Sequence, residues 1–301
     1  MERNVGIFNL QSGRVLRRPV KLLASDGLSA RPARIWTREK LRYLQKYAEA
    51  FMKAMAPKRS QGKWEHLDYI DLLSGPGLSI VRETKEEFDG SPLIALKIKP
   101  AFDHLYFADL NPENIAALRR RVPAQDADRV TFSAGDCNIV VDEVVKRISS
   151  RTLGLAFIDP EGFEVDFETL AKLAKKRIDL LYLFASGIGV RRNLKNALSV
   201  ANSRLDKWWG GKDWRDLPAA RWAAGKFSEE PAEKVLQSFV SAFRKKVASA
   251  GFQFQDEEVL PFTNTKNAQM YHLLYFSHDQ AGLTIWNNIK KIAPGGQRTL
   301  L

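Results

Sequence analysis

The amino-acid sequence predicts an α/β protein with a mostly parallel sheet of seven strands, of which the last two form an antiparallel pair. Short apolar runs, typical of strands buried on both faces, alternate with helical patterns along most of the chain. Acidic residues stand at or near the end of four of these runs. The last two runs, Phe252–Phe262 and Met270–Ser277, are too close in sequence for a helical crossover, so antiparallel pairing is expected.

The first strand is predicted in the stretch Tyr69–Gly77, which is an apolar run that holds Asp71 and ends in two glycines. Gly75 and Gly77 allow the backbone to approach a ligand closely, and a buried carboxylate requires a polar partner. This pattern predicts a nucleoside cofactor at the end of the strand. Because G-x-G alone is a weak signal, a plain strand-to-loop corner is the alternative.

A basic, irregular arm is expected over residues 1–35, and one domain over residues 36–301. Apolar residues at helical spacing predict an amphipathic helix from Thr37 to Met55, followed by a loop over Pro57–Lys63. The cations of this helix are assigned to its other, polar face; they are Arg38, Lys40, Arg42, Lys46 and Lys53.

A polar insert, Leu78–Asp89, precedes a helix that is predicted to begin with Ser91 as N-cap and Pro92 in the first turn. Four further strands are expected, with helices between them, at His104–Asp109, Val130–Asp136, Leu153–Pro160 and Asp179–Ser186. A helical insertion rich in Trp and Lys is expected at about residues 193–230.

The net charge of +12 is concentrated at the N-terminus. Residues 1–65 hold 15 Lys and Arg against 5 Asp and Glu, whereas the rest of the chain holds 32 against 30. This asymmetry points to an arm or face that meets a polyanion, either RNA or DNA, with a solvated tail as the alternative. Arg191, Arg192 and the Trp/Lys insertion suit phosphate contacts with base stacking, although irregularly spaced tryptophans are more typical of a core.

Several function classes are disfavoured by composition. The chain has one cysteine and four histidines without metal-ligand spacing, so no metal site is expected. No apolar run is long enough to cross a membrane, and the N-terminus lacks the apolar segment of a signal peptide. A cytoplasmic protein is therefore expected.

Four aspartates are expected together at the carboxyl edge of the sheet: Asp71, Asp109, Asp136 and Asp159. Ligands of open α/β sheets bind at this edge, where the strand order reverses. Asp109 is placed to accept hydrogen bonds from ribose hydroxyls. Asp136 could meet the amino group of adenine, with Cys137 lining the ring. Each acid alone could instead be a helix N-cap or a loop residue.

The motif spacing disfavours a dinucleotide. NAD sites typically carry G-x-G-x-x-G with an acid about 20 residues further on. Here Ile80 stands at the third glycine position, and Asp109 follows Gly75 by 34 residues. The seven-strand arrangement over about Trp64–Leu301 instead resembles the Rossmann-like class I methyltransferases. That resemblance implies S-adenosyl-L-methionine as cofactor, with Asp71, Ser74, Gly75 and Gly77 around its methionine part.

A closer resemblance rests on motifs that occur in order: W-T-R-E-K-L, D-L-L-S-G-P-G, G-S-P-L-I-A-L, A-D-L-N-P-E-N, G-D-C-N, F-I-D-P-E-G-F and G-L-T-I-W-N-N-I. The set resembles the three-Cys-motif partner (TcmP) family and implies a methyltransferase-like fold. The glycine-rich loop, the G-S-P helix start and the D-P pair are also similar to bacterial ribosomal-RNA adenine-N6 methyltransferases.

The D-P-E-G-F stretch departs from the [DNS]-P-P-[YFW] tetrapeptide of the amino methyltransferases that act on nucleic acid. Asp159 and Pro160 match it, Glu161 replaces the second proline, and Phe163 is the nearest aromatic residue, one position late. The departure leaves Asp159 as the candidate for substrate orientation or general base, and Phe163 for stacking on an extruded base. Pro160 and the two arginines after the fifth strand, Arg191 and Arg192, are the other residues expected to contact the substrate.

Together these patterns predict a methyltransferase that uses S-adenosyl-L-methionine and acts on nucleic acid. Two alternatives remain from the residues alone. The first is a non-catalytic partner that keeps the fold to bind a nucleotide or another protein. The second is a methyltransferase that acts on protein or a small molecule.

Overall fold

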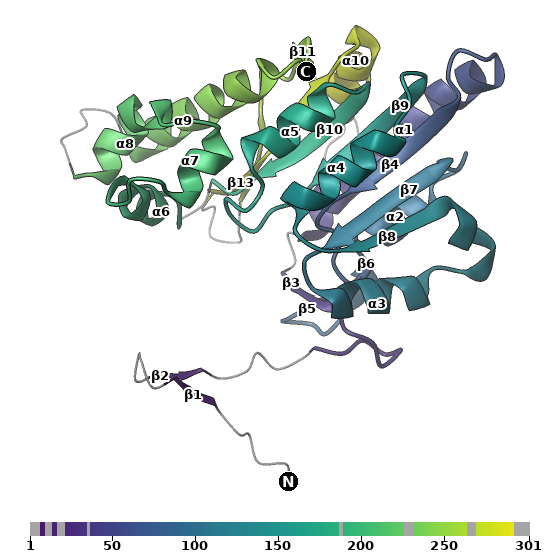
Figure 1. Cartoon of the computed structure of the whole chain (residues 1–301), viewed down its shortest axis with the longest axis horizontal. Coiled ribbons are helices and arrows are strands. Elements are labelled where there is room, and N and C mark those ends of the chain that lie inside the picture. Colours follow the sequence, from purple (N-terminus) through teal and green to yellow (C-terminus); the bar gives the residue numbers. More distant parts are fainter. Residues whose placement is uncertain are drawn as a thin grey trace.

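A mostly parallel sheet forms the centre of the computed structural model, which describes residues 7–9, 14–16, 22–34, 37–186, 189–225, 231–263 and 269–291 (Figure 1). The strand order is β11-β13-β10-β9-β4-β7-β8, and β12 also pairs with β13. The five strands from β10 to β8 are parallel, and β13 runs antiparallel to β10. The predicted fold class is therefore confirmed. The strands are β4 (His66–Asp71), β7 (His104–Asp109), β8 (Val130–Ala134), β9 (Thr152–Ile158), β10 (Ile178–Phe184), β11 (Phe254–Gln255), β12 (Leu260–Thr263) and β13 (Gln269–Ser277).

The C-terminal strand pair differs in one detail from the prediction. Two short strands, β11 and β12, replace the single strand expected over Phe252–Phe262, and both pair with β13. Asp256 follows β11 directly, and its buried carboxylate accepts hydrogen bonds from Trp286 and Lys290 of the last helix.

Helices cover both faces of the sheet (Figure 1). Successive strand residues point to opposite faces, so Tyr69 joins the core formed with α1, α2, α3 and α10, whereas Ile70 joins the core formed with α4 to α9. The α-helices are α1 (Thr37–Ser60), α2 (Ser91–Lys97), α3 (Pro112–Arg121), α4 (Cys137–Arg147), α5 (Phe167–Ala174), α6 (Gly189–Leu198), α7 (Arg204–Trp209), α8 (Pro218–Ala223), α9 (Ala232–Ala248) and α10 (Gln280–Lys290); the 3-10 helices are η1 (Ala124–Arg129) and η2 (Asp213–Asp216).

The tryptophans of the insertion belong to the core. Trp208, Trp209 and Trp214 are all buried, and the Trp208 ring stacks on Phe243 of α9 with 4.0 Å between centroids. These three rings are core residues, as their irregular spacing favoured, and they are not available as stacking platforms for a nucleic acid. Apolar burial of the rings attaches α7 and η2 to the body of the protein.

The end of the N-terminal arm is more ordered than expected. Strand β3 (Arg31–Ala33) pairs in parallel with β5 (Leu78–Val81), which pairs with β6 (Glu87–Asp89) in the predicted polar insert. Arg121 of α3 fixes the preceding turn by binding the Asp26 carboxylate and the Ser29 carbonyl. Long-range pairing thus orders residues 22–34, which carry no strong local signal. The strands β1 (Ile7–Asn9) and β2 (Arg14–Leu16) pair with each other, and the rest of the arm lies outside the described residues.

Two helix boundaries also differ. Helix α1 continues past Pro57 to Ser60. Gly90, not Ser91, is the N-cap of α2, because Ser91 is already the first helical residue. The Gly90 N–H donates to the Gly77 carbonyl at 2.6 Å and so anchors the helix start to the glycine loop.

Candidate active site at the sheet switch point

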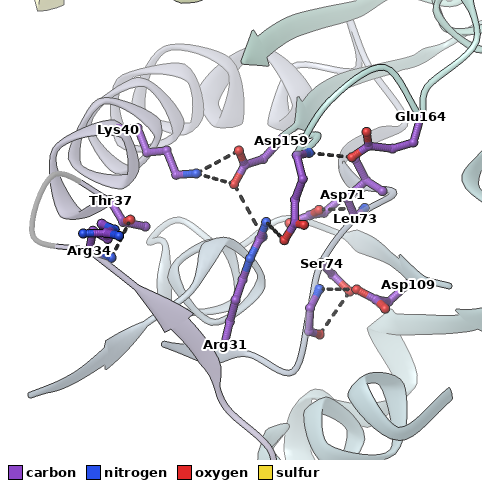
Figure 2. Close-up of polar contacts among 12 residues, drawn as sticks. Arg31, Arg34, Thr37, Lys40, Asp71, Leu73, Ser74, Asp109, Asp159 and Glu164 are labelled. Atoms are coloured by element: carbon purple, nitrogen blue, oxygen red, sulfur yellow. Dashed lines mark hydrogen bonds and ion pairs between the residues drawn. The ribbon is translucent and has the colours of Figure 1, made fainter. Parts of the chain in front are cut away.

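The strand order reverses between β4 and β9, with β7 and β8 on one side and β10 and β13 on the other. Ligands of open α/β sheets bind at such a point. Asp71 ends β4 and Asp159 directly follows β9, and the two strands are neighbours. Their carboxylates, with Ser74 and Asp109, converge at this edge (Figure 2).

The glycine loop after β4 has the expected backbone. Gly75 and Gly77 have φ values of 63° and 93°, which glycine adopts without steric cost. A Cβ at Gly77 would lie 2.8 Å from Leu118, whereas a Cβ at Gly75 would approach Arg31 alone among the described residues, at 3.9 Å. Packing therefore requires Gly77, and Gly75 leaves space on the side of Arg31.

Asp109 holds this loop in place. Its Oδ2 accepts a hydrogen bond from the Gly75 N–H at 3.0 Å, and its Oδ1 accepts from the Asn111 N–H and the Asn114 side chain. The half-buried carboxylate has room for about one more donor, because a carboxylate offers about four acceptor positions. Asp109 is thus turned toward the site, and its role with a ribose stays a prediction.

Asp136 is the N-cap of α4, as the alternative for this residue anticipated. Its Oδ1 accepts from the Asn138 N–H at 2.8 Å, and the side chain is exposed at the ligand edge. Cys137 is buried, and burial raises the pKa of its thiol to about 12. The thiol is therefore neutral and is not a nucleophile, and its place beside an adenine ring stays a prediction.

Two exposed apolar side chains at this edge escaped the sequence analysis. Leu110 follows Asp109 and is 72% exposed, and Ile139 lies close after Asp136 and is 71% exposed. They are two of the four large apolar side chains that are exposed in the described part of the chain. For Leu110, a large apolar residue immediately after a strand-end acid was the available signal.

Asp71 is a buried carboxylate with an unfilled acceptor. It is fully buried; its Oδ1 accepts from the Leu73 N–H at 3.2 Å, and its Oδ2 has no hydrogen-bond partner among the described residues. Burial raises the pKa of Asp71 to about 7, although the nearby Ser91 hydroxyl favours the charged form. The Tyr69 hydroxyl, two residues earlier on β4, is also buried and has no hydrogen-bond partner in the described part of the chain. These atoms call for a polar ligand or water.

Asp159 is held by two cations that the sequence analysis did not place in the site (Figure 2). The Lys40 Nζ donates to both carboxylate oxygens at 2.8 and 2.6 Å, and Arg31 lies 3.6 Å from Oδ2. Burial alone would raise the pKa of Asp159, but the charges of Lys40 and Arg31 hold it below its usual value. Arg31 also pairs with Glu161 at 3.3 Å.

Lys40 corrects the assignment of the α1 cations to the polar face. It is 9% exposed and lies on the same side of the helix as Leu44 and Tyr47. The spacing of four and seven residues from these core positions was the missed signal, because it places the lysine on the apolar face.

The hollow at the switch point is nearly closed. Arg31, Lys40, Ser74, Ser91 and Asp159 line a cavity of about 20 Å³. That volume holds about one water molecule. Of the four aspartates expected to fringe a pocket, only Asp159 lines this cavity, which in this conformation is too small for a nucleoside.

Hydrogen bonds between its own residues hold the loop after β9. The Glu164 carboxylate accepts from the backbone N–H groups of Glu161 at 2.5 Å and Gly162 at 2.8 Å. Pro160 is buried, and the half-buried Phe163 ring packs edge-on against Trp208 with 4.7 Å between centroids. Phe163 therefore lies on the loop that follows Asp159, against the helical insertion, and it does not line the cavity at the switch point, whereas Pro160 is covered.

The other predicted substrate residues, Arg191 and Arg192, lie in the first turn of α6, and their side chains fall outside the described residues. Among the described residues, no group of three or more His, Cys, Asp or Glu side chains could hold a metal ion. No helix in the same part of the chain has the length and apolarity to cross a membrane.

No protein-family model matches the chain, and the comparison with curated proteins finds no match. Among solved structures, it is similar to a Legionella pneumophila protein assigned to the family model DUF519, with 13% identity, 80% of this chain and 88% of that chain covered, and a TM-score of 0.47. It is also similar to TYW2 of M. jannaschii in complex with AdoMet, with 10% identity, 81% of this chain and 77% of that chain covered, and a TM-score of 0.42. A third similar structure is an O-methyltransferase from Bacillus cereus in complex with SAH, with 8% identity, 78% of this chain and 80% of that chain covered, and a TM-score of 0.41.

Proposed function

We propose that the chain is a cytoplasmic methyltransferase of the three-Cys-motif partner family, which uses S-adenosyl-L-methionine and acts on nucleic acid. The single observation that carries the cofactor is the unfilled Oδ2 of Asp71 beneath the glycine loop. A buried carboxylate oxygen is costly unless a donor satisfies it, and an ammonium group is the strongest donor available. The methionine part of the cofactor carries such a group.

The surroundings of Asp71 also suit the carboxylate of the cofactor's methionine part. Arg31 lies over the open side of Gly75, and its guanidinium is the candidate partner of the cofactor carboxylate. To take that role, the side chain must leave Asp159 and Glu161. It is 31% exposed and stands on the edge strand β3, so it is the more movable of the two cations on Asp159.

The adenosine part is supported by the acids of the next two strands and their apolar neighbours. Asp109 faces the glycine loop and retains acceptor capacity for a ribose hydroxyl. Leu110 and Ile139 expose apolar surface beside Asp109 and Asp136, where a planar ring would cover them. These residues fit an adenosine group.

When bound, the cofactor supplies a methyl group on a sulfonium, so the protein mainly has to position the acceptor. Asp159 suits that task. A general base works best with a pKa near the working pH, whereas Lys40 and Arg31 keep the pKa of Asp159 low. We therefore assign Asp159 to accepting a hydrogen bond from the acceptor group and not to removing its proton.

Nucleic acid as the acceptor is supported by the charge of the N-terminal 65 residues and by the net charge of +12. The buried tryptophans of the insertion give it no support. Phe163, on the loop that follows Asp159, remains the aromatic candidate for a base.

A non-catalytic partner that binds a nucleotide or a protein is the second candidate. The cavity of about 20 Å³ and the paired state of Asp159 favour it. A protein that never opens this hollow would bind no cofactor there.

Calorimetry with S-adenosylmethionine and S-adenosylhomocysteine tests the proposal. We expect heat of binding from the full chain and a loss of about tenfold or more in affinity for Asp109→Ala. The exposed Asp128→Asn on η1 is the control. Absence of heat would remove the enzyme and favour the second candidate. Transfer of a labelled methyl group into fractionated RNA, DNA and protein then identifies the acceptor class.

A further inference from the structure

A second hollow lies beside the loop that follows β9, on the side of the helical insertion. It has a volume of about 590 Å³, within the usual range for small-molecule sites of roughly 300–1,000 Å³. Its walls are Phe163 and Glu164 of the loop, Asn193 and Asn196 of α6, and Arg204 at the start of α7. The loop that begins at Asp159 of the proposed active site therefore also forms one wall of this hollow.

The charged groups of the hollow are neutralised within the protein. Arg204 pairs with Asp166 and donates to the Glu164 carbonyl. The Glu164 carboxylate is occupied by two backbone N–H groups. No unpaired charge in the described lining calls for a charged ligand, so a phosphate or a carboxylate has no obvious partner here.

The remaining lining is apolar, aromatic and carboxamide, apart from Ser203, whose hydroxyl accepts from the Asp206 N–H as the cap of α7. Val200 is 49% exposed, and the half-buried Phe163 ring is held against Trp208. Asn193, Asn196 and Asn202 are exposed, and their side chains have no hydrogen-bond partner among the described residues. A carboxamide offers both donors and an acceptor, the pattern that pairs with the edges of a heterocyclic base.

We infer that this hollow binds a neutral heterocyclic base of the nucleic-acid substrate, between the Phe163 ring and the carboxamides of α6. The inference rests on the proposed function for its choice of substrate. It assigns the helical insertion to substrate binding through Asn193 and Asn196, and not through its tryptophans. The base stacks on or against the aromatic ring, and the carboxamides contact its edge.

The test uses the full chain and a single-stranded oligonucleotide that contains 2-aminopurine, a fluorescent adenine analogue, titrated at fixed salt. Asn196→Leu keeps a similar volume and removes the carboxamide, and Phe163→Leu removes the ring. Each should weaken binding by about tenfold, the range of one base–aromatic contact. Asn196→Gln should retain most of the affinity.

Asn288→Leu is the matched control, because Asn288 is an exposed asparagine on α10, which covers the other face of the sheet. Thermal melting of each variant separates lost binding from lost folding. An oligonucleotide of the same length with an abasic site should bind to the wild-type protein with about the affinity that the Asn196→Leu variant has for the intact oligonucleotide. Equal affinities for abasic and intact probes, or equal effects of Asn196→Leu and Asn288→Leu, overturn the inference.

The two proposals fail separately. Calorimetric heat with S-adenosylmethionine, without an effect of Asn196→Leu on the oligonucleotide, removes the base site and leaves the methyltransferase. An effect of Asn196→Leu without cofactor heat leaves the base site and removes the enzyme.

Discussion

Replacing Asp71 with asparagine should stabilise the fold at neutral pH while weakening the binding of the cofactor. The asparagine keeps the size of the side chain and can still accept from the Leu73 N–H, but it carries no charge. Burial raises the pKa of Asp71 from its ordinary value of 3.8 to about 7. The unfolded chain therefore loses this proton well before the folded protein does.

The size of the stability effect follows from that interval. A carboxyl whose pKa is raised in the folded state contributes stability that is complete below pH 3.8 and is lost as the pH rises through 7. At 1.36 kcal/mol per pH unit, the interval corresponds to about 4 kcal/mol. In urea unfolding, the free energy of unfolding of Asp71→Asn minus that of the wild type should increase by up to this amount between pH 4 and pH 7.5. Asp128→Asn should gain nothing.

Binding changes in the opposite direction. The cofactor's ammonium group pairs with ionised Asp71, and ionisation rises from about 10% at pH 6 to about 90% at pH 8 when the pKa is about 7. Calorimetry should show that wild-type affinity for S-adenosylmethionine rises about tenfold over this range. The Asp71→Asn protein should bind weakly with no such slope. A less stable variant at pH 8, or a flat wild-type profile, would refute the reasoning.

Three further predictions concern the surroundings of the site. Asp159→Ala leaves Lys40 as an unpaired buried cation and should lower the free energy of unfolding in urea by about 3–5 kcal/mol. The double variant Lys40→Met/Asp159→Ala should recover most of that loss, and an equal loss in the single and double variants would show that the pair is not coupled. Ile139→Asp should lower the calorimetric affinity for S-adenosylhomocysteine and leave the melting temperature unchanged, whereas the control Leu23→Asp should change neither quantity. A large fall in the melting temperature of Ile139→Asp would show that Ile139 has a packing role. Deleting residues 1–21 keeps β3 and Arg31 but removes five cations, so the slope of log affinity for single-stranded RNA against log salt should fall by up to about 3, and an unchanged slope contradicts phosphate contacts by the arm.

The parallel sheet and its strand ends could be predicted from the sequence because both depend on local patterns. Continuous apolar runs mark buried strands, and all parallel strands end at the same edge, so acids at the ends of β4, β7, β8 and β9 had to come together. The glycine loop was equally accessible, since only glycine adopts its backbone angles without strain. These features did not require knowledge of which distant segments pack together.

The state of the site was decided by tertiary structure. Lys40 and Asp159 are 119 residues apart, and Arg31 and Glu161 are 130 apart. The helical spacing of Lys40 places it on the apolar face of α1, but no local pattern shows which acid it meets. The two pairs meet because β3 joins the β5–β6 hairpin and because α1 packs its apolar face, with Lys40 on it, against the sheet. Burial of Trp208 and Trp214 likewise depends on how α7 and η2 fold back onto α9. The sequence alone determined where the carboxylates lie, and long-range packing determined which cations face them and how little space remains.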